Sequence, residues 1–139
     1  MSRTLVCAFA LLALLPCAAQ EAAVKKTSPR YTSPTSGPEM YQAYCASCHG
    51  PAGKGDGPVV AALKGAVPDL TTLAKRSGGT FPAKRVGELI RGESATPAHG
   101  SLDMPVWGPI FHSVSNREAA VVSMRVTHLT RHLEALQAK

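Results

Sequence analysis

Apolar residues recur at helical spacing near the end of the chain. Five of them follow one another at steps of three or four residues: Val122, Val126, Leu129, Leu133 and Leu136. This spacing places them on one face of an α-helix. The segment Ser115–Glu118 just before them has the sequence of a capping box, in which a serine and a glutamate bond the first free N–H groups of a helix. The pattern predicts a C-terminal amphipathic helix.

Two shorter helices are predicted upstream from their start signals. Ser36 is a suitable N-cap, with Pro38 in the first turn and Glu39 three residues after the cap, so a helix should begin there. Asp69 is a suitable cap for a second helix over residues 70–76, which the following pair of glycines should end. Each of these helices is expected to be short.

A further helix is predicted to begin near Pro82. It should bury Val86, Leu89 and Ile90 and end at Gly92, since glycine accepts the left-handed conformation that closes a helix. The chain carries no clear hairpin signal and no internal repeat. The pattern therefore predicts a small all-α fold of about four to five helices.

The first nineteen residues have the composition of a secretory signal peptide. Arg3 precedes an apolar run, and small residues follow up to Ala19, where cleavage is expected. The run is too short to span a bilayer, and nothing later replaces it, so no transmembrane helix is predicted. Cys17 resembles the lipidated cysteine of a lipoprotein signal, but Pro16 before it argues against lipidation. We expect a periplasmic or otherwise extracytoplasmic protein.

The next residues predict a linker. Residues 20–37 are rich in Pro, Ser and Thr and have little apolar spacing, which is typical of a flexible segment. Residues 38–139 then form one domain, which is what the length allows.

The chemistry of the chain is concentrated in residues 45–49, Cys-Ala-Ser-Cys-His. Cys-x-x-Cys-His is the attachment sequence for c-type haem. The two thiols add to the haem vinyl groups, and the adjacent imidazole binds the iron. A zinc site needs further ligands at finger-like spacing, and a thioredoxin-like motif follows a strand; the chain offers neither. The motif predicts one haem c, attached through Cys45 and Cys48, with His49 on the iron.

The ligand on the other face of the iron separates an electron carrier from an enzyme or sensor. Met104 is the leading candidate because it lies in a polar, turn-rich loop that Pro105 stiffens. His99 and His112 flank this loop and remain alternatives. Four other residues are less suited, either by their place on the attachment helix or by expected packing and surface roles on the last helix: Met40, Met124, His128 and His132.

Four segments resemble the class I monohaem cytochrome c family: CASCHG at 45–50, GKGDGP at 53–58, PDL at 68–70 and MPVWG at 104–108. The resemblance covers about residues 38–137. It implies an α-helical fold in which the terminal helices cross, with one haem edge exposed.

The resemblance also implies roles for individual residues. His49 and Met104 would be the axial ligands of the iron. The carbonyl of Pro58 would accept the proton on Nδ1 of His49, a contact that fixes the ring and tunes the metal. Trp107 and Tyr44 would pack near the haem.

These features predict an electron-transfer protein that cycles its haem between Fe(II) and Fe(III), and not an enzyme. One alternative is a cytochrome c subunit of a membrane-associated dehydrogenase or oxidase complex. Another is an open-site haem sensor or peroxidase, for which His99 and Arg91 would supply the acid and base.

The charge of the chain bears on its partners. The net charge is +6, or +5 once Arg3 leaves with the signal. Basic residues are spread through the middle of the chain: Lys54, Lys64, Lys75, Arg76, Lys84, Arg85 and Arg91. They lack the interleaved aromatic residues of nucleic-acid binding and are expected to be solvated surface or to steer a redox protein, either acidic or membrane-bound. The sequence leaves the oligomeric state open.

Overall fold

The computed structural model describes residues 29–63, 65–93 and 107–138. Within these ranges the chain forms helices and turns and no β-strand, which confirms the all-α prediction. The α-helices are α1 (Gly37–Tyr44), α2 (Ala46–His49), α3 (Leu73–Arg76), α4 (Ala83–Arg91), α5 (Trp107–Val114) and α6 (Ala119–Ala135). Two 3₁₀ turns complete the set: η1 (Val60–Ala62) and η2 (Leu70–Thr72).

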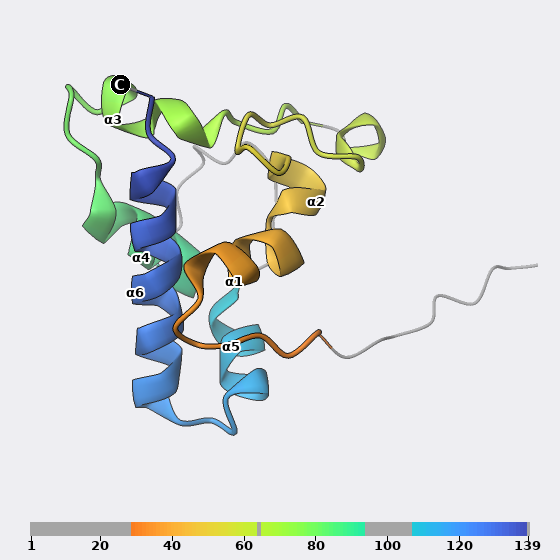
Figure 1. Cartoon of the computed structure of the whole chain (residues 1–139), viewed down its shortest axis with the longest axis vertical. Helices are drawn as coiled ribbons and strands as arrows, with labels where there is room; N and C mark the ends of the chain where they lie inside the picture. Colours follow the sequence, from red (N-terminus) through yellow and green to blue (C-terminus); the bar gives the residue numbers. More distant parts are fainter. Residues whose placement is uncertain (1–28, 64, 94–106, 139) are drawn as a thin grey trace, which may run out of the picture.

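Helices α1 and α6 cross each other, as expected for the terminal helices (Figure 1). The start of α1 is also as predicted, since the Ser36 hydroxyl accepts a hydrogen bond from the Glu39 N–H at 3.3 Å. Gly37 lies at the crossing. A Cβ atom there would be 2.8 Å from Cβ of His132 and would clash with the backbone oxygen of His128. A residue without a side chain is therefore what allows the two helices to approach so closely.

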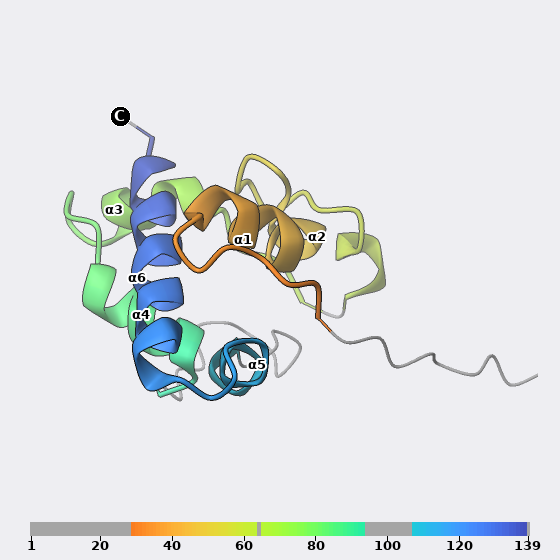
Figure 2. The ribbon, with the colours of Figure 1, turned by 60° about the horizontal axis from the view of Figure 1, so that its bottom comes forward.

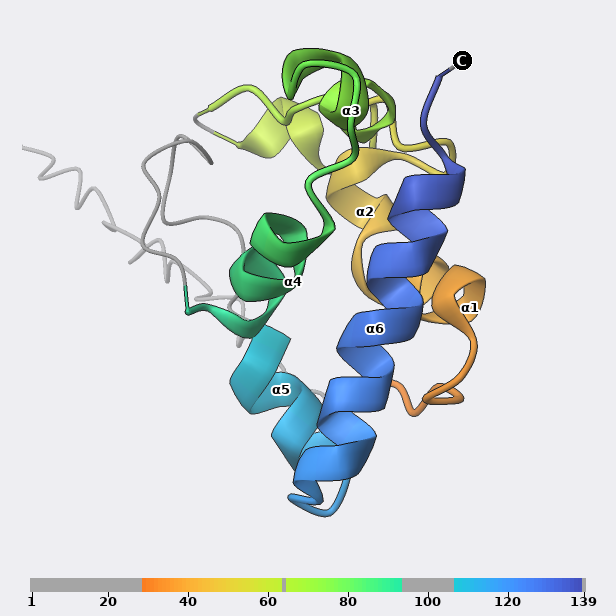
Figure 3. The same cartoon turned by 90° about the vertical axis from the view of Figure 1, so that its left-hand side faces the viewer.

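Helix α6 is the central element of the molecule, and α4 and α5 pack against it on the side away from α1 (Figure 3). The predicted stripe is confirmed, because Val122, Val126, Leu129 and Leu133 are all buried. Leu136 is half-buried and packs against the core. Burying one apolar face of this helix against three others gives the fold most of its core.

Helix α4 also follows the sequence prediction. It buries Val86 and Ile90, and it ends at Gly92, which adopts the left-handed conformation at φ +77°. Leu89 is only half-buried by protein because it faces a cavity described below.

The region before α6 differs from the prediction. No helix was predicted over residues 107–114, where the structure has α5. The capping box is wrong as well: α6 begins after Glu118 with no side-chain cap, and Ser115 instead accepts a hydrogen bond from Nε of Arg125 at 2.9 Å. Two left-handed residues, Asn116 and Arg117, turn the chain between the helices.

The end of the predicted linker belongs to the packed body of the protein. Thr32 is 1 % exposed, and residues 29–36 pass between α1 and α5 (Figure 2). The predicted signal peptide, Cys17, His99 and Met104 lie outside the described residues. Among the helices of the described ranges, none has the length and apolar character needed to cross a bilayer.

Candidate functional site

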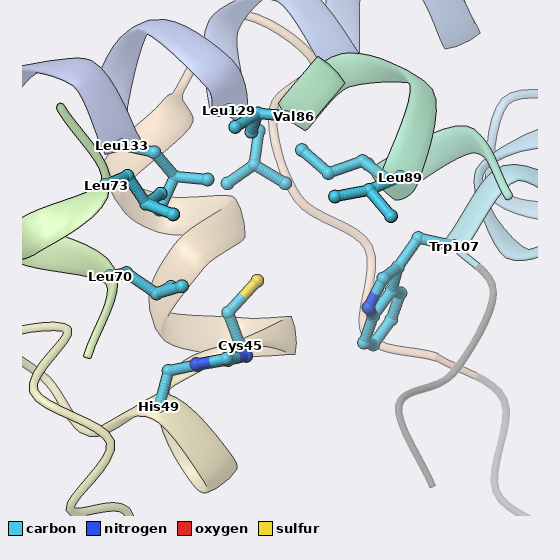
Figure 4. Close-up of a pocket in the computed structure, with 10 residues that line it drawn as sticks. Cys45, His49, Leu70, Leu73, Val86, Leu89, Trp107, Leu129 and Leu133 are labelled. Atoms are coloured by element: carbon cyan, nitrogen blue, oxygen red, sulfur yellow. The ribbon is translucent and has the colours of Figure 1, made fainter. Parts of the chain in front are cut away.

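A largely apolar cavity lies between α2, α4, α6 and the start of α5 (Figure 4). Its volume is about 530 Å³ including its open mouth. Ten residues line it: Cys45, His49, Leu70, Leu73, Val86, Leu89, Ile90, Trp107, Leu129 and Leu133. Both polar side chains that suit metal or thioether chemistry, Cys45 and His49, lie at the same end, with Sγ of Cys45 directed into the cavity. Leucines from three other parts of the chain form the opposite wall.

A single helical turn brings the attachment residues together. The His49 N–H bonds the Cys45 carbonyl at 2.9 Å, and α2 ends there. The glycine loop then folds back along this turn. The N–H groups of Gly55 and Gly57 bond the carbonyls of His49 and Cys48 at 2.9 and 3.1 Å. These bonds satisfy carbonyls that the end of a helix leaves free, so the loop holds the attachment turn in place.

His49 is 7 % exposed, and its Nδ1 lies 3.4 Å from the carbonyl oxygen of Pro68. The resemblance indicated Pro58 for this position, and the structure corrects that prediction. Pro58 is exposed at the far end of the glycine loop, after the loop has paired with α2. The chain returns to His49 only later, where the Leu70 N–H bonds the Gly53 carbonyl at 2.7 Å.

The end of α6 holds the leucine wall of the cavity. The Gln137 amide accepts a hydrogen bond from the Ala74 N–H at 2.8 Å and donates to the carbonyls of Leu70 and Leu133 at 2.9 and 2.7 Å. One side chain therefore ties η2, α3 and α6 together. This fixes Leu70 and Leu133 on facing parts of the wall.

Burial keeps the Cys45 thiol uncharged. Loss of hydration, followed by repulsion from Cys48, raises the pKa of Cys45 to about 12. A reactive redox cysteine or a zinc thiolate has a lowered pKa instead. Within the described ranges, no three His, Cys, Asp or Glu side chains are grouped as a metal ion would require. The surroundings of Cys45 therefore favour neither a thioredoxin-like nor a zinc site.

Trp107 and Tyr44 were both expected near the cofactor. Trp107 lines the cavity, and the Tyr44 ring packs behind it at a centroid distance of 5.2 Å. Tyr44 does not itself line the cavity. Phe111 lies 5.7 Å from Tyr44 and completes an aromatic cluster between α1 and α5.

The candidates for the ligand on the other face of the iron that lie within the described ranges do not line the cavity. Met40 is fully buried in the core, whereas Met124 is 39 % exposed. His112 is exposed, and His132 packs against Tyr41 at a ring distance of 5.1 Å. His128 is half-buried where α1 crosses α6.

A second groove adjoins the cavity and shares Leu70, Leu73, Val86 and Leu89 with it. Arg76 and Arg85 line this groove and not the cavity. The combined space thus passes from an apolar end with a thiol and an imidazole to a positively charged end. An amphiphilic molecule with anionic groups at one edge would match this change from an apolar to a positively charged lining.

Sequence reasoning missed the wall of the cavity and the acceptor on His49. The helical spacing of the wall leucines predicts that they are buried, but it does not distinguish a face packed on protein from a face packed on a ligand. The acceptor of the His49 hydrogen bond could not be predicted from the sequence, since any residue supplies a backbone carbonyl.

The comparisons with known proteins agree with this geometry. A family model described as Cytochrome c matches residues 35–121. Neither the curated proteins nor the solved structures gave a match to the chain. The matched segment contains the attachment turn, Pro68 and Trp107. Members of the cytochrome c family bind haem and use it for electron transfer. With the family model covering more than half of its length, the chain belongs to the cytochrome c family.

Proposed function

We propose that this protein is an extracytoplasmic class I monohaem cytochrome c that carries single electrons between partner proteins and does not itself transform a substrate. The observation that carries the proposal is the placement of Cys45 and His49 at one end of a deep apolar cavity. An electron carrier needs a cofactor shielded from water and held rigidly, so that its surroundings change little between redox states.

The residues present fit a haem c. Cys45 and Cys48 would hold it by thioether bonds, and the leucine walls would exclude water from its faces. A haem bound here supplies a one-electron Fe(II)/Fe(III) couple. The exposed guanidinium groups of Arg76 and Arg85 are placed to pair with its carboxylates. The Pro68 carbonyl would accept the Nδ1 proton of His49 and leave Nε2 for the iron.

Met104 is the sixth ligand in this proposal. It lies three residues before Trp107, which lines the cavity. Three residues span at most about 11 Å, so the chain enters α5 within reach of the haem site. Among the alternatives, His112 is exposed on α5 and does not line the cavity.

Replacement of the methionine tests the ligand assignment. Met104→Ala should lower the reduction potential, abolish the methionine-to-iron absorption band and allow carbon monoxide to bind. Met124→Ala, which changes an exposed methionine, is the matched control and should leave all three unchanged. If Met104→Ala behaves like the control, Met104 is not the ligand. The same three measurements on His112→Ala and His99→Ala would then show which histidine binds the iron.

The N-terminal signal sequence supports the proposed location, and the charges of the chain support the proposed partner. Secretion should release a mature protein that begins at Gln20, and its intact mass measures this directly. Other basic side chains on α3 and α4, Lys75 and Lys84, are exposed and suit an acidic redox partner. Electron transfer to such a partner should slow steeply with added salt. A rate that does not depend on salt would exclude steering by these charges.

A further inference from the structure

Arg125 is a charged side chain in the core of the protein. It lies on α6 and is 0 % exposed. Its Nε donates to the Ser115 hydroxyl and its Nη1 to the Thr32 hydroxyl, each at 2.9 Å. Tyr31 covers the guanidinium, with the ring centroid 5.5 Å away. All of these neighbours are electrically neutral.

The hydrogen bonds beyond Thr32 run in one direction. Tyr44 donates its only hydroxyl hydrogen to the Arg30 carbonyl, so it accepts a hydrogen bond from Thr32 across the 3.0 Å contact between the two hydroxyls. Thr32 in turn accepts from Arg125. The chain of donors therefore starts at the buried cation and ends at the ring that packs behind Trp107. Such an aligned chain polarises outward from the positive charge.

No carboxylate balances this charge within the described part of the chain. The ion pairs there join Lys84 to Glu88 and Arg91 to Glu93. Nη2 of Arg125 is buried and has no hydrogen-bond partner. Buried charges are ordinarily paired, because an unpaired one loses its hydration without compensation. The Arg125 side chain is thus out of contact with water, and no carboxylate in the described part of the chain cancels its charge.

Two sets of contacts connect Arg125 to residues of the cavity wall. Leu129, which lines the cavity, is one helical turn further along α6, about 6 Å in rise. On the other side, Tyr44 separates the Thr32 hydroxyl from Trp107. Thr32 and Tyr44 therefore lie between the guanidinium and Trp107 in the cavity wall, in an interior whose low dielectric carries the effect of a charge further than water does.

We propose that Arg125 is a fixed internal positive charge that raises the reduction potential of the haem. This inference rests on the proposed haem site. Ferric haem carries one more positive charge than ferrous haem, so a nearby cation disfavours the ferric form. Ser115, Thr32 and Tyr31 offset only part of the cost of burying the charge.

The first test compares the potentials of three variants at low and high ionic strength. Arg125→Gln should lower the potential, and the shift should persist at high salt because the site is buried. Arg125→Lys keeps the charge and should stay close to the wild type. Arg131→Gln removes an exposed charge from the same helix, and any small shift should disappear with salt. Equal potentials for Arg125→Gln and the wild type would overturn the inference.

A second pair of variants keeps the arginine, in case its loss prevents folding. Thr32→Asp places a carboxylate against Nη1 and should lower the potential by neutralising the cation. Thr32→Asn is the neutral control and should lower the unfolding temperature without moving the potential. If both variants have the wild-type potential, the proposal fails while the haem site stands. A protein that acquires no haem at all would instead refute the proposed function.

Discussion

The carbonyl oxygen of Pro68 faces Nδ1 of His49 at 3.4 Å, across 19 residues of chain. This contact depends on how the segment before Pro68 passes the glycine loop. Gly55 lies in the left-handed region at φ +79°, and a Cβ atom there would be 3.2 Å from the carbonyl carbon of Val67 and still closer to its oxygen. The absence of a side chain at position 55 is therefore what lets the acceptor reach the histidine.

Gly55→Ala should displace the backbone at residues 67 and 68 and loosen His49. The left-handed alanine costs about 1 kcal/mol by itself, and the clash adds to it. Gly78→Ala is the matched control, since Gly78 has φ +74° and nothing within 4 Å of the added atom. We expect both variants to lose stability in denaturant titrations, with only Gly55→Ala changing the reduction potential. A potential shift of the same size in the control would show that the contact is not responsible.

Two helix glycines should respond in opposite ways to replacement by alanine, one at the crossing of α1 and α6 and one inside α4. Gly37→Ala should force the helices apart, because the new atom clashes with the backbone of α6, and we expect a loss of roughly 1–3 kcal/mol. Gly87→Ala lies inside α4, where the nearest atoms are 3.6 Å away. Alanine should stabilise that helix by up to about 1 kcal/mol. Thermal unfolding measures both, and destabilisation by Gly87→Ala as large as that by Gly37→Ala would contradict the packing described here.

Tyr41 connects the first helix to the residue after the attachment turn. Its hydroxyl donates to the Gly50 carbonyl at 2.7 Å, and the side chain is fully buried. Tyr41→Phe leaves that carbonyl without its donor, which should cost about 1–3 kcal/mol. Burial, together with repulsion from the Asp56 carboxylate, raises the pKa of Tyr41 from 10.0 to about 12.

This raised pKa predicts how the effect of the variant depends on pH. The stabilising contribution of the neutral hydroxyl is complete below pH 10 and is lost as the pH rises from about 10 to about 12. The wild type should therefore lose more free energy of unfolding than Tyr41→Phe between pH 8 and pH 11. Equal losses in the two proteins would show that Tyr41 is not held in its neutral form.

The sequence predicted the elements whose signals are local. Ser36 caps a helix and Gly92 ends one because each needs only its own turn of backbone to do so. The stripe on α6 was equally accessible, because helical periodicity is a property of the segment itself. The attachment motif belongs to the same class, since its five residues occupy a single turn.

The features that were missed depend on contacts between distant segments. Ser115 has the sequence of a helix cap, but Arg125 takes its hydroxyl. Thr32 was assigned to a linker, yet it bonds an arginine 93 residues away. Pro58 and Pro68 are equivalent as sequence signals, and only the path of the chain decides which carbonyl meets His49. Such choices are set by packing and cannot be read from local pattern.

The most direct test of the account is the visible spectrum of the mature protein, oxidised and reduced, with and without carbon monoxide. A saturated carrier should show a methionine-to-iron band when oxidised, and its reduced spectrum should not change under carbon monoxide. Ready binding of carbon monoxide by the reduced protein would mean that the iron has an open face, and would contradict the proposal that this cytochrome c is an electron carrier.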